Sequence, residues 1–334
     1  MVIAEVYILQ NYFHGLPKQS DFKLIEEELP PLKDGEFLAE ALYLSVDPYM
    51  RVKFKDLKLG STFFGYQVAK ITESKSKEYP IGTNIVGAFG WRSHTIYDGT
   101  SKLFAIPPVW KIPDLGDFPL SLALGIVGRV GNTAYFGCLD LLRPKNGETL
   151  VVSGAGGGVG SHVGQIGKLN GCKVVGITGS DEKGEWLVNE LQFDHFINYK
   201  KPNFLETLKK YTADGVDCYF DNTGGEISAN VITRMNTYGR VAVCGLISNY
   251  NATEPRAAFP IDTYILRLQL KVEGFMVHRW ADRWEEGIMQ NLQWLKEGKL
   301  KYKETVTCGF ENVVSAFIGM LKGDNVGKAV VKVE

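Results

Sequence analysis

A glycine-rich segment near the middle of the chain has the residue types that hold a dinucleotide. Residues 149–161 read TLVVSGAGGGVGS, so an apolar run leads directly into glycines, and a helical pattern begins near Val159. A strand, a glycine turn and a helix N-terminus together offer backbone N–H groups and a positive dipole end to a pyrophosphate. On the G-x-G-x-x-G pattern the key positions are Ala155, Gly157 and Gly160. The pattern predicts a dinucleotide turn, with an ordinary strand–helix turn as the alternative.

The end of the next strand indicates which dinucleotide would bind. Residues 173–178 read KVVGIT, a short run rich in β-branched residues. NAD-binding units usually end this strand with an acidic residue for the adenosine ribose, but here Gly179 and Ser180 follow. Ser180 or Asp181 is placed to cap the helix that begins there. Lys183 would meet the 2′-phosphate of NADPH, or it is simply a solvated lysine. The segment favours NADPH over NADH.

Length and composition are those of a globular enzyme with two domains. The chain has 334 residues, of which 45% are hydrophobic and 22% charged, and its formal net charge is -1. Such a charge argues against nucleic-acid or anionic-membrane partners. No apolar run is long enough to cross a bilayer, and the N-terminus lacks the pattern of a signal peptide. We expect a cytoplasmic protein that binds neither nucleic acid nor membrane.

The cysteines and histidines do not form the pattern of a metal site. Catalytic zinc needs about three protein ligands from Cys, His or acidic residues, yet no cysteine precedes Cys138, and His14 and His94 stand alone. The scattered cysteines are typical of reduced thiols rather than of a disulfide framework. We expect no metal. The five cysteines are Cys138, Cys172, Cys218, Cys244 and Cys308.

Three stretches of the chain differ in their patterns. Residues 1–125 carry short apolar runs broken by Pro and Gly, as in an irregular β domain. In residues 126–309 strands alternate with helical patterns, which predicts an α/β fold with a doubly wound parallel sheet. Residues 310–334 hold a short helix and a closing strand that we expect to return to the first domain. The strands predicted in the middle stretch are 149–153, 173–178, 195–198, 216–221, 240–244 and 269–275.

Five short motifs, spread over nearly the whole chain, resemble one enzyme family. They are similar to motifs of the zinc-independent medium-chain dehydrogenase/reductase superfamily and, within it, of the prostaglandin reductase family. That family is also known as leukotriene B4 12-hydroxydehydrogenase or alkenal/one oxidoreductase. The motifs are VDPYMR (46–51), GNTAYFG (131–137), GSDEK (179–183), DCYFDN (217–222) and MLKGDN (320–325).

The resemblance implies a fold and an activity. The fold would be a GroES-like β domain built from residues 1–125 and 310–334, with a Rossmann domain inserted at 126–309 and the active cleft between them. Family members reduce the carbon–carbon double bond of α,β-unsaturated ketones and aldehydes with NADPH, including 15-oxo-prostaglandins and 2-alkenals. They also oxidise the allylic 12-hydroxyl of leukotriene B4 with NADP⁺. They typically form homodimers.

The resemblance also implies a set of cofactor contacts. Gly156, Gly157, Gly158 and Val159 would face the pyrophosphate, and Lys183 and Tyr199 would flank the 2′-phosphate. Several of these residues have a structural alternative: Tyr199 as an aromatic that ends a strand, Asn222 as a helix cap, and Asn325 as a turn residue. The remaining contacts implied by the family are Asn222, Cys244, Gly245, Leu246, Ile247, Ser248, Asn249, Tyr250, Phe275, Met276, Val277 and Asn325.

Reduction of an enone asks for a hydrogen-bond donor where enolate charge develops. Tyr250 is the predicted donor, because a phenol with a pKa near 10 stays protonated at neutral pH. Its alternative is a surface-loop residue, since Ser-Asn-Tyr-Asn is ordinary turn composition. Tyr49 is a weaker candidate for lining the substrate pocket. Asp47 and Arg51 are expected to pair or to shape their turn rather than to catalyse.

One segment departs from the family pattern. At the position of residues 251–261, the pattern of the mammalian prostaglandin reductases is similar to a run of prolines. This chain has only Pro255 and Pro260 there. Proline-rich segments are stiff, so we expect a more flexible lid that carries Arg256 and Phe259 and an altered substrate preference.

Two other functions remain open. One is a quinone or enoyl reductase of the same superfamily, which would differ in the lining of its pocket. The other is a non-catalytic NADPH-binding protein with a structural or regulatory role, because a fold does not establish a function. Such a protein would keep Gly157 and Lys183 but would not need Tyr250.

Overall fold

The structure is a computed structural model that describes residues 2–99, 109–254 and 259–334. The chain divides into two compact units. The β unit comprises Met1–Leu124, Thr305–Asn325 and Ala329–Glu334, and the α/β unit comprises Gly125–Glu304 and Val326–Lys328. Both ends of the chain therefore build the β unit, and a short piece of the tail belongs to the α/β unit.

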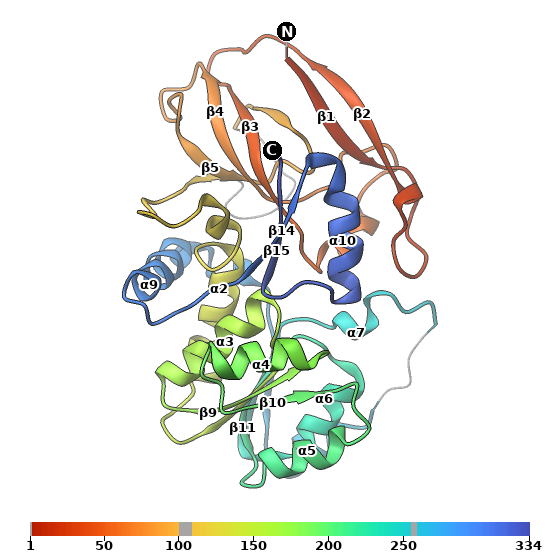
Figure 1. The fold of residues 1–334 in the computed structure, drawn as a ribbon, viewed down its shortest axis with the longest axis vertical. Coiled ribbons are helices and arrows are strands. Elements are labelled where there is room, and N and C mark those ends of the chain that lie inside the picture. The colour runs from red at the N-terminus through yellow and green to blue at the C-terminus, as the bar shows by residue number, and fades with distance from the viewer. Residues whose placement is uncertain (1, 100–108, 255–258) are drawn as a thin grey trace. The chain divides into compact units, whose positions relative to one another are not determined.

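Antiparallel pairing dominates the β unit. Within the described residues, β1 pairs with β2, and a seven-stranded sheet has the order β14-β15-β3-β4-β5-β7, with β6 against β3. The closing strand β15 lies antiparallel to β3 (Figure 1). The elements are β1 (Val2–Leu9), η1 (Gln19–Asp21), β2 (Phe22–Leu29), β3 (Phe37–Ser45), α1 (Met50–Lys53), η2 (Phe54–Asp56), β4 (Gln67–Ser74), β5 (Asn84–Gly87), β6 (His94–Tyr97), β7 (Val109–Lys111), η3 (Leu120–Leu124), β14 (Glu304–Cys308), η6 (Phe310–Asn312), α10 (Val313–Lys322) and β15 (Lys328–Lys332).

Aromatic side chains fill the core of the β unit. The ring centroids of Phe63 and Trp91 are 4.5 Å apart, and Phe317 of α10 lies 5.6 Å from Trp91. Phe22 meets Phe63 edge-on at 5.0 Å. All four rings are buried. Large buried rings contribute strongly to packing, so this cluster attaches the C-terminal helix to strands from the N-terminal part of the chain.

The α/β unit holds a parallel sheet with the order β10-β9-β8-β11-β12-β13. That order is the doubly wound Rossmann order, and helices cover the sheet (Figure 1). The predicted fold class is confirmed. The elements are α2 (Arg129–Phe136), η4 (Gly137–Leu142), β8 (Thr149–Ser153), α3 (Gly158–Leu169), β9 (Lys173–Thr178), α4 (Asp181–Asn189), β10 (His195–Asn198), α5 (Phe204–Tyr211), β11 (Val216–Asp221), α6 (Gly225–Ile232), β12 (Met235–Val243), α7 (Ile247–Tyr250), α8 (Asp262–Arg267), β13 (Lys271–Gly274), η5 (Val277–Arg283) and α9 (Trp284–Lys296).

The predicted bounds of the last two strands of this sheet were wrong. β12 begins at Met235 rather than at residue 240, because Met235 already pairs with Val216 ahead of a bulge. β13 is shorter than predicted: Gln269 has a φ of 51°, a left-handed conformation that a strand does not accommodate. The predicted bounds of β8, β9, β10 and β11 agree with the structure.

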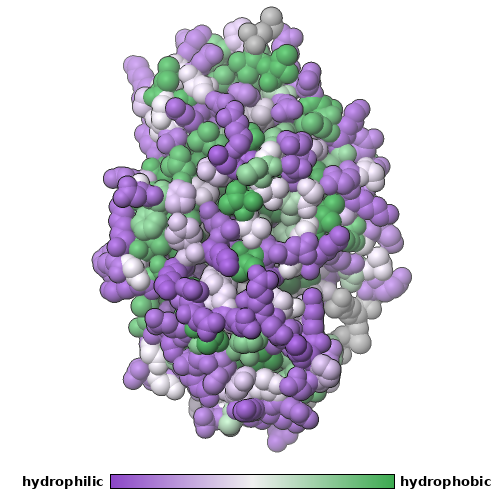
Figure 2. Space-filling model, viewed as in Figure 1, coloured by the Kyte–Doolittle hydropathy of each residue, from purple (hydrophilic) through white to green (hydrophobic). Residues whose placement is uncertain are grey.

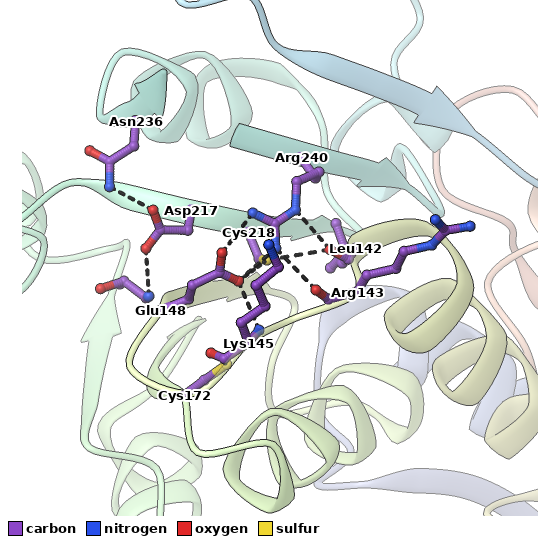
Figure 3. A network of polar contacts seen from close by, with 10 residues as sticks. Leu142, Arg143, Lys145, Glu148, Cys172, Asp217, Cys218, Asn236 and Arg240 are labelled. Atoms are coloured by element: carbon purple, nitrogen blue, oxygen red, sulfur yellow. Dashed lines mark hydrogen bonds and ion pairs between the residues drawn. The ribbon is translucent and has the colours of Figure 1, made fainter. Parts of the chain in front are cut away.

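Polar contacts join β12 to the amino ends of β8 and β11 (Figure 3). Arg240 of β12 donates to Glu148 at 2.6 Å and to the Leu142 carbonyl at 2.8 Å. Asp217 of β11 accepts from the Thr149 N–H at 2.8 Å. Although burial opposes the charge, the hydrogen bond from Arg240 lowers the pKa of Glu148. Glu148 and Arg240 therefore neutralise each other within the unit, and Asp217 is stabilised by hydrogen bonds.

Polar and charged side chains predominate on the face shown in Figure 2, and apolar residues stand between them. Among the described residues, no helix is long and apolar enough to cross a membrane. The five cysteines are free thiols: Cys138, Cys172 and Cys218 are buried, Cys244 is half-buried and Cys308 is exposed.

A buried histidine joins two helices of the α/β unit. His162 of α3 is 2% exposed, and its Nε2 lies 3.0 Å from Oδ1 of Asn291 on α9. Burial lowers the pKa of His162 to about 4, because the charged imidazolium is poorly solvated there. The neutral form is therefore built into the fold.

We predict that His162 makes the chain sensitive to acid. In the unfolded chain the imidazole has its ordinary pKa near 6.5, whereas in the folded chain its pKa is lower. The free energy of unfolding is therefore highest above about pH 6.5 and falls as the pH drops toward 4, by on the order of 3 kcal/mol. Urea unfolding at pH 7 and pH 4.5 measures this loss. His162→Gln should flatten the pH dependence, while His14→Gln, at an exposed position, should keep it. An unchanged slope in the His162 variant contradicts the prediction.

Candidate functional site

The glycine turn follows β8 at the carboxyl edge of the parallel sheet. Gly154 has a φ of 62°, which favours glycine, and its carbonyl accepts a hydrogen bond from the Gly157 N–H at 3.1 Å. Helix α3 begins at Gly158, one residue before the predicted start. The structure therefore has the strand, turn and helix N-terminus that a pyrophosphate needs.

Close packing explains which glycines of the turn are required. A Cβ atom at Gly160 would lie 2.4 Å from the Gly154 carbonyl oxygen and 2.7 Å from the Cα of Ala155. The helix can approach the strand end only without that atom. Ala155, at the position of the first glycine, is fully buried, and its N–H donates to the Ile177 carbonyl at 3.0 Å. Alanine is therefore accommodated there.

The structure brings Lys183 to the glycine turn. A Cβ atom at Gly156 would lie 2.9 Å from Cδ of Lys183 and 2.9 Å from Oγ1 of Thr178. The lysine stem thus packs beside the turn, at the end of β9. Ser180 is the residue that caps α4, because its Oγ accepts the Lys183 N–H at 3.3 Å. Asp181 instead forms an ion pair with Lys201 at 2.8 Å.

Tyr199 follows β10 and lies beside the end of β9. A Cβ atom at Gly179 would be 3.2 Å from the Tyr199 hydroxyl, and the tyrosine side chain is 41% exposed. The ring therefore lies over the glycine at the strand end. A cation, a phenol and a glycine turn on neighbouring segments are a chemically suitable set for the phosphate groups of NADPH. These residues fit the cofactor that the sequence predicts.

A second contact to the turn comes from the tail and was missed by the sequence analysis. The Gly327 N–H donates to the Gly156 carbonyl at 2.8 Å, and the Lys328 N–H donates to the Lys303 carbonyl at 3.0 Å. Gly327 has a φ of 69°, and a Cβ atom there would lie 2.0 Å from the Lys303 oxygen. The available signal was a second glycine in GDNVGK. Asn325 belongs to the β unit, and its cofactor contact stays a prediction.

Asn222 ties two strand ends together. Its Nδ2 donates to the Ser153 carbonyl at 2.7 Å, and its backbone N–H donates to the Ser153 hydroxyl at 3.0 Å. The helix-cap alternative is wrong, because the N-cap of α6 is Gly224 and no side chain caps it. The preceding residue, Asp221, was not singled out from the sequence. It is buried and accepts several hydrogen bonds, and only its place at the end of an apolar strand could have pointed to it.

The segment after β12 lies against the loop after β11. The N–H groups of Cys244 and Gly245 donate to the Asp221 carbonyl at 2.8 and 3.1 Å, and the Ser248 N–H donates to the Thr223 carbonyl at 3.1 Å. The residues Ile247, Ser248, Asn249 and Tyr250 form helix α7 rather than an open turn, with Leu246 at its N-cap.

Tyr250 is half-buried, and its hydroxyl has one partner in this segment. The Leu246 N–H donates to the phenolic oxygen at 3.3 Å. Burial raises the pKa of Tyr250, which the Leu246 N–H partly offsets. Because the oxygen acts as acceptor toward Leu246, the phenolic hydrogen is directed elsewhere. This is the chemistry expected of a donor to an oxyanion.

The three predicted nicotinamide residues after β13 have different surroundings. Phe275 is buried and packs edge-on against Phe220 and Trp280, so its ring belongs to the core. Met276 is 44% exposed, and Val277 is buried at the start of η5. The side chain of Phe275 is therefore not available to a ligand, and a contact through the backbone of this segment stays a prediction.

In the β unit, the VDPYMR motif forms a tight turn and α1. Arg51 is buried and donates to the Gly15 carbonyl at 2.6 Å, while Asp47 accepts from the Ser45 hydroxyl at 2.5 Å. These contacts agree with structural roles for both charges. The Tyr49 ring stacks on Phe64 at 6.2 Å, and its place in a substrate pocket stays a prediction.

The predicted lid is described only in part. Pro255 and Arg256 fall in 255–258, outside the described residues. Phe259 is 45% exposed. The expected flexibility of 251–261 and its effect on substrate choice stay predictions.

Comparison with known proteins identifies the family. One family model, described as the N-terminal domain of oxidoreductase, matches residues 6–106, and a second, described as zinc-binding dehydrogenase, matches residues 158–294. Rat prostaglandin reductase 1 is 52% identical over 334 residues, covering 99% of this chain and 100% of the relative. The NADP⁺-dependent 2-alkenal reductase of Nicotiana tabacum is 38% identical, covering 98% and 96%. CurA from Vibrio vulnificus, solved in complex with NADPH, has a TM-score of 0.90 at 37% identity, and 99% of each chain is covered.

The fold and the dinucleotide turn are those of the medium-chain dehydrogenase/reductases, and the chain belongs to that superfamily. Within it, the full-length similarity shows that the chain belongs to the prostaglandin reductase family. The predictions of an NADPH-dependent oxidoreductase and of double-bond reduction are confirmed at this level.

One of the two family descriptions mentions zinc. Over the ranges that the structure describes, no three His, Cys, Asp or Glu side chains are grouped so that they could hold a metal ion. Catalytic zinc needs about three ligands of these kinds.

Proposed function

We propose that the chain reduces the α,β double bond of enones and enals, with 15-oxo-prostaglandins and 2-alkenals as substrates. It would also oxidise the allylic 12-hydroxyl of leukotriene B4 with NADP⁺. The observation that carries the proposal is the packing of Lys183 against Gly156, which joins a cation to the dinucleotide turn. Full-length relatives named for prostaglandin and 2-alkenal reduction support the choice of substrates. A cytoplasmic location is part of the proposal and agrees with five free thiols.

The proposed reaction needs little from side chains. NADPH supplies the hydride, which adds to the β-carbon while the π electrons move toward the carbonyl oxygen. Tyr250 donates its phenolic hydrogen bond to that oxygen and stabilises the enolate charge. A proton from solvent water would then add to the α-carbon of the enolate, which leaves a single bond between the α- and β-carbons. Tyr49 is proposed to line the substrate pocket.

Most of the proposed cofactor contacts come from the segments that follow the strands of the parallel sheet. Gly156, Gly157, Gly158 and Val159 hold the pyrophosphate at the start of α3, and Lys183 and Tyr199 flank the 2′-phosphate. Backbone atoms of Phe275, Met276 and Val277 hold the nicotinamide amide. The other proposed contacts are Asn222, Cys244, Gly245, Leu246, Ile247, Ser248, Asn249, Tyr250 and Asn325.

Lys183 should determine the preference for NADPH. Losing a charge-assisted hydrogen bond to the 2′-phosphate weakens binding by about tenfold to a hundredfold, so Lys183→Ala should raise KM for NADPH by that factor and leave NADH unaffected. Following NADPH and NADH absorbance with a 15-oxo-prostaglandin and a short 2-alkenal measures both effects. Lys200→Ala, at an exposed neighbouring position, is the control. Tight NADPH binding without turnover on either substrate would instead favour the non-catalytic alternative.

Tyr250 should affect turnover rather than cofactor binding. Tyr250→Phe removes a donor that acts on developing charge, so kcat should fall by about tenfold to a hundredfold with little change in KM for NADPH. Because burial raises the pKa of Tyr250, the unaltered chain should keep its kcat from about pH 6 to 9. Tyr264→Phe, on exposed α8, is the control. Full activity of the Tyr250 variant rules out the oxyanion role.

We propose further that the chain forms a homodimer through the edge strand β13. β13 pairs with β12 on one side, and it is the last strand of the described sheet. An unpaired edge is a template for pairing with another strand. Exposed apolar side chains stand on β13 and on the segments beside it: Val272 is 37%, Leu266 79% and Tyr238 66% exposed. A twofold arrangement would join the two edges and cover these side chains.

Charge placed on that edge should separate the subunits. Val272→Lys should raise the dimer dissociation constant at least about tenfold, because each subunit would bury a lysine in the joined edge. Light scattering after size exclusion measures the mass against concentration. Leu205→Lys is the control: it places the same charge on exposed α5, which packs beside β10 at the opposite edge. Equal masses for both variants argue against this interface.

A further inference from the structure

A buried carboxylate stands at the carboxyl end of β11. Asp221 is 2% exposed, and its Oδ1 accepts hydrogen bonds from the Tyr219 hydroxyl at 2.8 Å and the Ser153 hydroxyl at 3.0 Å. The backbone N–H groups of Thr223 and Gly224 donate to the same oxygen at 3.0 and 2.9 Å. These partners are all donors, which is the environment of an ionised carboxylate that only accepts.

Neutral hydrogen-bond donors, and no positively charged side chain within ion-pair distance among the described residues, stabilise the Asp221 carboxylate. In the part of the chain that the structure describes, no ion pair includes Asp221. The contrast lies at the other end of the sheet, where Glu148 is paired with Arg240 at 2.6 Å. Hydrogen bonds from neutral donors stabilise an anion without cancelling its net charge, so its field extends to neighbouring groups through the poorly screening interior.

Asp221 lies next to the segment that is proposed to hold the nicotinamide. The Asp221 carbonyl accepts the N–H groups of Cys244 and Gly245, and a Cβ atom at Gly245 would be 3.3 Å from the Tyr250 hydroxyl. Burial raises the pKa of Cys244 to about 12; the negative charge of Asp221 adds to this effect, and the positive charge of Arg129 opposes it. Asp221 thus acts electrostatically on the segment that also carries Tyr250.

We propose that the buried Asp221 carboxylate favours the oxidised form of the bound cofactor and so promotes hydride donation. The nicotinamide ring is neutral in NADPH and positively charged in NADP⁺. A fixed negative charge at the strand ends stabilises the positively charged ring of NADP⁺ more than the neutral ring of NADPH. Because it stabilises one of the two forms more, it shifts the equilibrium between the bound forms toward NADP⁺. The inference rests on the proposed function, because it places the nicotinamide at this edge of the sheet.

The ratio of two dissociation constants tests the inference without turnover. Fluorescence and calorimetric titrations of the full chain give Kd for NADP⁺ and for NADPH. Asp221→Asn removes the charge and keeps the shape, and Asp221→Ser leaves a hydroxyl and space for water. In both variants Kd for NADP⁺ should rise about tenfold more than Kd for NADPH. Asp221→Glu, which restores the charge, should return the ratio toward that of the unaltered chain.

Asp217→Asn is the matched control. Asp217 stands on the same strand at its amino end, where it accepts from the Thr149 N–H and from Asn236. Its loss should destabilise the fold without changing the NADP⁺ to NADPH ratio. Equal changes of both dissociation constants in the neutral Asp221 variants would overturn the inference, because a purely structural role moves both alike.

A measurement on the unaltered chain covers the case in which neither neutral variant folds. Carbon-13 NMR of the aspartate carboxyl groups reports whether Asp221 is ionised at neutral pH, with Asp221→Glu used to assign its signal. An ionised group supports the inference, and a protonated one overturns it. Failure of the unaltered chain to bind either cofactor would instead reject the proposed function.

Discussion

The close approach of α3 to the end of β8 is the constraint on which the α/β unit depends. A Cβ atom at Gly160 would lie 2.4 Å from the Gly154 carbonyl, so the helix can start directly at the strand end only because glycine stands there. This approach places the N–H groups at the start of α3 over the carboxyl edge of the sheet. Because parallel strands all end at that edge, the residues after β9, β11 and β12 lie around the same turn.

The two ends of the parallel sheet use polar residues differently. At the amino ends, Glu148 and Arg240 neutralise each other, and Asp217 satisfies a strand N–H, so these contacts fix the sheet. At the carboxyl ends, hydrogen-bond donors surround the Asp221 carboxylate, which has no ion-pair partner among the described residues, and Asn222 links the loops after β8 and β11. Burying a carboxylate costs solvation energy. The proposed effect of Asp221 on the bound cofactor gives this buried charge a function. Stability and function are therefore assigned to opposite ends of the same strands.

The sequence predicts the parts of the site that depend on local pattern. The bounds of β8 to β11 follow from short β-branched runs, and the glycine turn and Lys183 follow from motif spacing. The contacts that it does not predict are non-local. Nothing near Asp221 in the sequence indicates that Ser153 will donate to it, and the pairing of Gly327 with Gly156 joins residues far apart in the chain. The predicted start of β13 was wrong because Gln269, in a left-handed conformation, belongs to the end of α8, where the N–H groups of Gln269 and Leu270 donate to carbonyls of that helix.

Non-local hydrogen bonds restrain the glycine turn by connecting it, through the tail and the segment 301–303, back to α3. Gln165 of α3 exchanges two hydrogen bonds with the backbone of Lys301, at 2.7 and 3.0 Å. Two residues later, the Lys303 carbonyl accepts from the tail, and the tail in turn donates to Gly156 in the turn that leads back into α3. A turn held on both sides does not have to be ordered when a pyrophosphate binds, so less binding energy is lost to entropy. The tail thereby restrains the glycine turn through the backbone, independently of any side chain it presents.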